Sequence, residues 1–288
     1  MALATASTAR RIAAAPGYSY FVGSAVFHYL GPSFAVLLFA RVAPVGVAWL
    51  RVVTAALIYA AWRRPWRVWP TVDGRGRTTI VAMGVVLALM NPCFYLAIAR
   101  LPLGTVAAIE FLPVIALAAV GARTVRNGVA LAAAVAGVYL LTDVRLSGRP
   151  LGFVFAFLNA GLFALYIVAA HRVARLATMG GIDGLAAAML VAAVAVTPIG
   201  GWSAASAFDD PVALAAGVGV GVSSSVIPYV CDQLAMAKLA RSTYALFVAL
   251  LPATATVVGI VVLDQVPSVL EAAAIALVAS AVALHRAP

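Results

Sequence analysis

Charged side chains are scarce in this sequence: they make up 10% of its 288 residues, whereas hydrophobic residues make up 65%. Ordinary soluble domains hold about 25% charged and roughly 45–50% apolar residues. A soluble protein of this size would lack the polar side chains needed to cover its surface, and the apolar content also excludes a disordered chain. The composition therefore predicts an integral membrane protein made almost wholly of spanning segments, without room for a soluble domain.

Cysteine and clusters of metal ligands are nearly absent. The two cysteines, Cys93 and Cys231, lie inside apolar runs, which argues against a disulfide framework. Asp209 and Asp210 have no further acidic or histidine residue close in sequence, so we expect a helix cap before Pro211 rather than a metal site. The sequence predicts neither a metal nor a cofactor.

Motifs of nucleotide binding and nucleophilic catalysis are also missing. The glycine-rich run GVGVGV (217–222) lacks the strand–turn–helix context of a phosphate-binding loop. Its G-x-x-x-G spacing favours close packing of one helix against another.

The net charge of +10 does not form the compact basic face that nucleic-acid binding requires. Basic residues instead stand singly between apolar runs. With the N-terminal tail (residues 1–17) placed in the cytoplasm, fourteen of the nineteen Lys and Arg residues fall on the inner side. The outer loops then hold four: Arg41, Arg100, Arg145 and Arg149. This bias predicts that both termini are cytoplasmic, which requires an even number of spans.

Apolar runs bounded by Arg, Pro, Gly or Asp divide the chain into ten candidate spans. A helix needs about 20 residues to cross a membrane, and the runs lack the alternation of a β-barrel, so helices are expected. The predicted spans are 18–39, 44–62, 79–99, 102–122, 126–141, 150–170, 184–200, 211–236, 242–263 and 267–285.

An internal repeat links the two halves of the chain. Residues 93–101 (CFYLAIARL) and 231–239 (CDQLAMAKL) are identical at five of nine positions, at an offset of 138 residues. Each half would hold five spans, residues 18–141 and 150–285, and an odd number of spans inserts the halves with opposite topology. Inverted repeats of this kind place a substrate site near the middle of the membrane and support alternating access.

Three segments carry a resemblance to a known family. MNPCFYLAIARLPLGTVAAIEFLP (90–113), WLRVVTAALI (49–58) and SSVIPYVCDQLAMAKL (224–239) resemble ten-helix drug/metabolite transporters of the EamA type. The likeness is greatest to the bacterial threonine/homoserine exporters. The resemblance implies two inverted five-helix repeats around a central cavity, and efflux of amino acids or similar small metabolites.

The chain departs from the family pattern at two places. Members commonly carry a Glu before the proline of the ninth helix, where this sequence has Leu251 before Pro252. The usual Gly-Glu after that helix is replaced by Asp264-Gln265. The departures bear on substrate identity and leave the expected helix count intact.

Ionisable side chains inside spans are rare and expensive, so each one is a candidate for function. Glu110 lies about 12 Å into the fourth span, at 1.5 Å per residue. It could bind a substrate ammonium group or exchange a proton. Arg51 enters the second span from the same side to about 10 Å, so the two could form a pair. That pair could equally be a structural clamp, and Arg51 alone favours a structural role.

Two further ionisable residues lie within spans. Asp232, in the eighth span, could bind substrate or guard the inner entrance, and it could equally pair with Lys238 or Arg241. His28 lies near the middle of the first span, and the following Gly31 and Pro32 predict an interrupted helix there. A carbonyl-bonded structural histidine is the alternative.

Neutral polar residues complete the candidate site. Asn91-Pro92 and Ile227-Pro228 lie in the third and eighth spans, where each proline frees a main-chain carbonyl that a substrate or a side chain can use. The candidate lining residues are Asn91, Tyr95, Asn159, Tyr166, Ser223, Ser224, Ser225, Tyr229, Thr243 and Tyr244. For any single Ser or Thr, helix packing is the alternative role.

The sequence thus predicts an all-α inner-membrane transporter that exports amino acids or similar metabolites, with proton exchange at Glu110 as the hypothesis for coupling. One alternative is an uncoupled facilitator for aromatic or hydrophobic metabolites. Another is an intramembrane lipid-modifying enzyme, which would need clustered acids or His/Cys sites at the membrane surface. The expected partners are the small-molecule substrate and the lipid bilayer, and a homodimer is left open.

Overall fold

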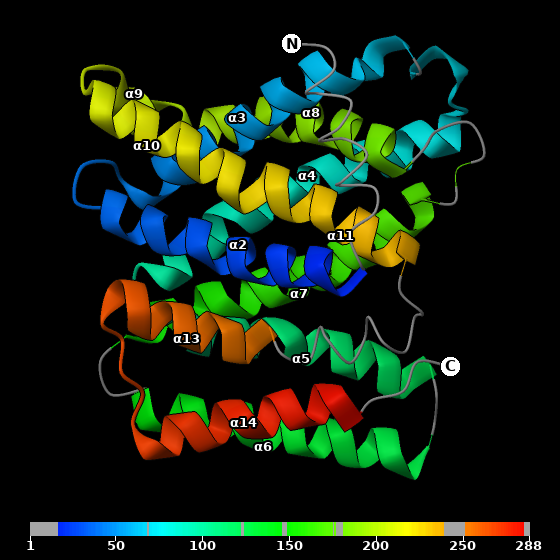
Figure 1. Ribbon diagram of the computed structural model, residues 1–288. Helices are drawn as coiled ribbons and strands as arrows, with labels where there is room; N and C mark the ends of the chain where they lie inside the picture. Colours follow the sequence, from blue (N-terminus) through cyan, green and yellow to red (C-terminus); the bar gives the residue numbers. More distant parts are fainter. Residues whose placement is uncertain are drawn as a thin grey trace.

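The computed structural model describes residues 17–67, 69–121, 124–145, 149–174, 176, 181–238 and 251–284. Regular structure within these ranges is entirely helical. Apart from the short elements, the helices run alongside one another in alternating directions, with their connections at the two ends of the bundle (Figure 1). The cytoplasmic tail predicted for residues 1–17 lies outside the described residues, apart from Gly17.

Five long helices come from the first half of the chain. They are α2 (Gly17–Leu38), α3 (Pro44–Arg63), α4 (Gly74–Ile98), α5 (Leu103–Gly121) and α6 (Val125–Arg145), with the short turns η1 (Pro65–Arg67) and η2 (Trp69–Thr71) between α3 and α4.

The second half supplies α7 (Pro150–Ala174), α8 (Gly181–Gly200), η3 (Trp202–Ala204), α9 (Ala205–Phe208), α10 (Pro211–Gly221), η4 (Val222–Val226), α11 (Ile227–Lys238), α13 (Leu251–Leu263) and α14 (Val269–Leu284). Of the span predicted at 242–263, only the part from Leu251 is described. The segments α10, η4 and α11 follow one another without a break and form one bent helix, in which η4 is a π-helix.

Six segments are long and apolar enough to cross a membrane: Gly17–Leu38, Pro44–Arg63, Gly74–Ile98, Pro150–Ala170, Gly181–Gly200 and Pro211–Asp232. Four shorter apolar helices accompany them: Leu103–Pro113, Val125–Leu140, Leu251–Leu263 and Val269–Ala281. The predicted all-α membrane architecture is confirmed at this level.

Helix ends follow local sequence signals. Proline stands at the first position of α3 and α10, where its missing N–H costs no hydrogen bond. Asp73 caps α4 by accepting from Gly76 N at 2.8 Å. Asp210 caps α10, accepting from Val212 N and Ala213 N, which confirms the cap predicted before Pro211.

Helices from the two halves pack against each other throughout the bundle. The pairs α3 with α8, α4 with α7, α2 with α11 and α6 with α14 are in extensive contact. The pair α6 and α14 lies at one edge in Figure 1, with α5 and α13 beside it.

The G-x-x-x-G spacing in α10 serves close packing, as predicted. A methyl group at Gly217 would lie 2.6 Å from the Leu50 side chain, and one at Gly221 would lie 2.6 Å from Thr54 Cβ. Leu50 and Thr54 are four residues apart on α3, so the two helices meet along matching rows.

The interruption predicted in the first span at Gly31 and Pro32 is wrong. Helix α2 continues through Pro32 to Leu38. The irregular segment is instead η4, which packs against α2. A methyl group at Gly31 would lie 2.8 Å from the main-chain nitrogen of Ser224, in η4. Gly31 is therefore required for the close approach of α2 to the π-helix.

Candidate functional site

Arg51 is buried at the contact between α3 and η4, with 5% of its surface exposed. Its Nε donates to Ser225 Oγ at 2.8 Å, and its Nη2 donates to the main-chain oxygen of Ser224 at 3.1 Å. The guanidinium carbon lies 5.6 Å from the centre of the Tyr95 ring, a cation–π geometry. We refer to Arg51, Tyr95, Ser224 and Ser225 as the Arg51 cluster.

Pro228 explains the bond to Ser224. Proline has no N–H, so the carbonyl four residues earlier, that of Ser224, receives no bond from residue 228. The side chain of Arg51 supplies a donor. A side chain thus uses a main-chain carbonyl close to Pro228 in the eighth predicted span. Tyr59 Oη adds a 3.3 Å bond to the next carbonyl, that of Ser225.

Glu110 of α5 is buried with 6% exposure, and its Oε1 accepts from Asn159 Nδ2 of α7 at 3.0 Å. Asn159 is fully buried, and its Oδ1 has no hydrogen-bond partner. We refer to Glu110 and Asn159 as the Glu110 pair. The pair joins one helix from each half of the chain.

Arg51 and Glu110 do not form the ion pair that their similar depth suggested. Neither takes part in a salt bridge with any residue that the structure describes. Their charges are nevertheless close enough to interact electrostatically. Depth along a helix does not determine the direction in which a side chain points, and these two are held by different neighbours.

Asp232 of α11 accepts a 2.6 Å bond from Ser24 Oγ of α2. The side chain of Lys238 and the whole of Arg241 lie outside the described residues, so the alternative pairings of Asp232 stay predictions. His28 of α2 is partly buried, and its ring meets that of Tyr29 edge to face. Tyr229 of α11 is buried, with 9% of its surface exposed.

Two other predicted lining residues, Asn91 and Tyr166, have neighbours other than Arg51 and Glu110. Asn91 bonds the carbonyl of Leu87 within its own helix, at 2.8 Å. Tyr166 is partly buried and stacks on Phe163. Their part in a substrate site stays a prediction, and Thr243 and Tyr244 lie outside the described residues.

Sequence reasoning missed Tyr29, whereas Ser224 was among the predicted polar candidates. Tyr29 and Ser224 are fully buried, and the Tyr29 hydroxyl and Ser224 Oγ have no hydrogen-bond partner. For Ser224 a signal exists, because it stands four residues before Pro228.

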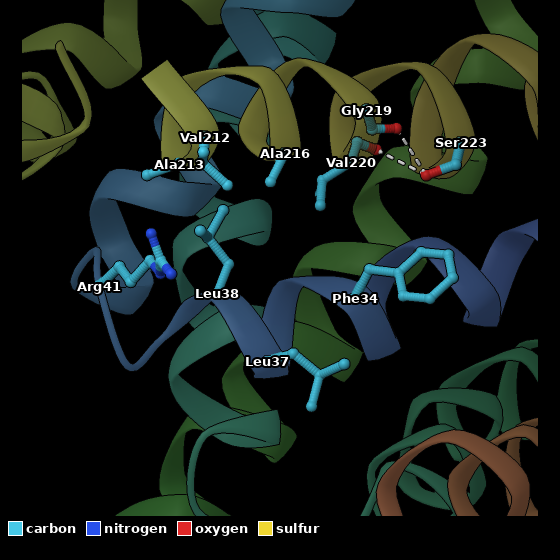
Figure 2. A pocket seen from close by; sticks show the side chains of 10 residues that line it. All are labelled: Phe34, Leu37, Leu38, Arg41, Val212, Ala213, Ala216, Gly219, Val220 and Ser223. Carbon is cyan, nitrogen blue, oxygen red and sulfur yellow. Dashed lines mark hydrogen bonds between the residues drawn. The ribbon is translucent and has the colours of Figure 1, made fainter. Parts of the chain in front are cut away.

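A separate apolar groove of about 460 Å³ lies between α2 and α10 and does not include Arg51 or Glu110. Figure 2 shows Phe34, Leu37 and Leu38 of α2 below the helix that carries Val220 and Ser223, with Arg41 at one end. Phe34 and Leu37 are exposed. Arg41 and Ser223 are the polar side chains in its otherwise apolar lining.

Apolar helices of spanning length with ionisable side chains buried between them are typical of a multi-pass membrane transporter. The threonine/homoserine exporters RhtA of Escherichia coli (strain K12) and Salmonella typhimurium (strain LT2) are each 31% identical to this chain over 243 residues. The alignment covers 82% of this chain and 79% of each relative. The chain therefore belongs to the RhtA family of EamA-type drug/metabolite transporters.

No protein-family model matches the sequence. A solved crystal structure matches 94% of this chain and 96% of its own, with a TM-score of 0.58 and 18% identity. At that identity the likeness concerns the fold alone.

Proposed function

We propose that this protein exports amino acids or similar small metabolites across the inner membrane by alternating access, in exchange for protons carried at Glu110. The observation that carries the proposal is the Glu110 pair: a buried carboxyl group without an ion-pair partner among the described residues, in a chain of the RhtA family. Carboxyl groups inside spans mark the proton relays of many transporters. Since the relatives are named as threonine/homoserine exporters, threonine and homoserine are the first substrates to test.

We further propose that ten helices cross the membrane as two inverted five-helix repeats, with both termini cytoplasmic. Under this assignment α2 corresponds to α7, α4 to the bent helix of α10, η4 and α11, and α5 to α13. The contacts support it, because the pair α4 with α7 then corresponds to the bent helix with α2. Likewise α5 with α7 corresponds to α13 with α2.

Energetically, a proton that enters under a membrane potential of 100 mV supplies about 2.3 kcal/mol. This would drive export without ATP. A shift of protonation at Glu110 would also change the charge that faces a substrate ammonium group.

The test is threonine flux in proteoliposomes with an imposed pH gradient. We expect wild-type flux to follow the gradient and Glu110→Gln to lose that dependence. Asp210→Asn is a matched control, because it neutralises a carboxylate at the edge of the bundle and keeps a helix-capping residue. Transport by E110Q that still follows the gradient would refute proton exchange at this residue, and gradient-independent wild-type flux would favour an uncoupled facilitator.

A further inference from the structure

Buried polar atoms without partners gather around the two separated charges. In the Arg51 cluster these atoms are the Tyr95 hydroxyl and Ser224 Oγ, and both side chains are fully buried. In the Glu110 pair the atom is Asn159 Oδ1. Buried polar groups in proteins are nearly always hydrogen-bonded, so each of these atoms requires an explanation.

The chemistry of these atoms differs between the two places. Beside Arg51 the unused groups are hydroxyls, which can donate. Beside Glu110 the unused atom is an amide oxygen, which only accepts. The first place therefore suits an anion and the second a cation.

The two charges interact electrostatically but make no direct ion pair with each other. Arg51 and Glu110 are both almost fully buried, and neither has an ion-pair partner among the described residues. A buried charge is expensive unless a partner compensates it. A zwitterion that brings a carboxylate to one and an ammonium group to the other would neutralise both without adding net charge.

We propose that Arg51 is the carboxylate anchor of the substrate site, with the hydroxyls of Tyr95 and Ser224 as additional donors, while Glu110 and Asn159 Oδ1 receive the ammonium group. This assignment rests on the proposed export function and narrows the substrate class to free α-amino acids. The planar fork of arginine suits a carboxylate, and lysine offers no equivalent pair of parallel donors.

Analogues of threonine that lack the carboxylate can test whether Arg51 binds that group. Threonine amide and threoninol keep the ammonium group and the side chain of threonine but present no negative charge to Arg51. A hydrogen-bonded charge pair left unmade in a buried site weakens binding by about tenfold to a hundredfold. We expect threonine to bind purified wild-type protein at least about tenfold more tightly than either analogue.

Arg51→Lys tests the anchor itself. We expect R51K to lose most of its affinity for threonine and little of its affinity for threoninol, so that the ratio of the two dissociation constants falls toward one. A merely structural role would weaken both ligands alike and leave the ratio unchanged, which would overturn the assignment.

Two serine variants test the same site if R51K does not fold. Ser224→Ala removes an unpartnered hydroxyl, whereas Ser223→Ala removes one that already donates to the Gly219 and Val220 carbonyls of its own helix (Figure 2). We expect S224A to reduce threonine affinity by about tenfold and S223A to leave it unchanged. Equal effects of the two serine variants would contradict the proposal.

Different binding results would contradict the role of Arg51 and the export function. Wild-type protein that binds threonine, its amide and threoninol equally would overturn the role of Arg51 and leave export of amines and amino acids intact. Wild-type protein that binds no amino acid, yet transports other solutes, would overturn the proposed function together with this assignment.

Discussion

Nη2 of Arg51 donates to the main-chain oxygen of Ser224, the carbonyl that Pro228 leaves without its usual donor. One proline thus creates an acceptor, and an arginine from the other half of the chain uses it. The contact ties α3 to the π-helix η4 at the level of the Arg51 cluster. The irregular helix is therefore the eighth predicted span rather than the first.

Replacing Pro228 with alanine would supply an N–H that competes with Arg51 for the Ser224 carbonyl. Proline inside a helix costs about 3 kcal/mol, so we expect P228A to raise thermal stability in detergent while it slows threonine flux. Pro198→Ala in α8 is the control, because Pro198 also lies inside a helix but contributes to neither the Arg51 cluster nor the Glu110 pair. If P198A slows flux as much as P228A, the effect does not arise from the Ser224 carbonyl.

Gly31 should not tolerate even a methyl group. In Gly31→Ala the new Cβ would clash with Ser224 Oγ and lie 2.8 Å from the main-chain nitrogen of Ser224, so helix α2 would have to shift. We expect a loss of about 1–3 kcal/mol, measured as a lower unfolding temperature. Gly219→Ala meets no atom within 4 Å and should stabilise the helix by about 0.5–1 kcal/mol. Equal stability of the two variants would contradict the close packing of α2 on η4.

Asp210 should make a pH-dependent contribution to stability. The main-chain N–H of Ala213, the guanidinium of Arg41 and the N–H of Val212 hold the pKa of Asp210 below its usual value. A carboxyl group whose pKa is lower in the folded state stabilises the fold above about pH 3.9, and this contribution is lost as the pH falls through the folded-state pKa. We therefore expect wild type to unfold at a higher temperature than Asp210→Asn at pH 7.

The same comparison at acid pH completes this test. Asparagine keeps the helix cap but cannot titrate, so the difference between the two proteins should shrink as the pH falls below about 3.9. A difference that stays constant from neutral to acid pH would show that the ionised carboxylate is not its source.

Cysteine labelling would test the proposed orientation. The chain has two cysteines, both free, so a background with Cys93 and Cys231 replaced by serine gives single-cysteine variants. We expect Phe208→Cys, between α8 and α10, to react with a membrane-impermeant maleimide on intact cells. Trp66→Cys, between α3 and α4, should react only after the membrane is opened. The opposite pattern would invert the proposed topology.

The helices could be predicted from the sequence because apolar length and terminal prolines are local properties. The span predicted at 44–62 is Pro44–Arg63 in the structure, and the one predicted at 150–170 is Pro150–Ala174. The largest extension is in α4, which begins at Gly74 rather than 79, since Asp73 provides a cap before the apolar run starts. Capping residues outside the apolar stretch set such ends.

The contacts within the site were less predictable from the sequence than the helices. Glu110 and Arg51 were recognised because ionisable residues in a span are conspicuous, but their partners depend on how each helix is rotated about its axis. The partner of Glu110 is Asn159. Pro32 and Pro228 look alike in sequence, yet only the helix with Pro228 is irregular at its proline, where η4 packs against α2 and α3.

The close approach of Gly31 to Ser224 has a mechanical consequence. Because there is no space between α2 and η4 for one to slide into the other, a transport cycle that keeps this contact moves the two segments as one body. They come from opposite halves of the chain, as do α4 and α7, which are also in extensive contact. The rigid units of a transport cycle would then be composites of the two halves, and no single contiguous stretch of sequence would correspond to a moving part.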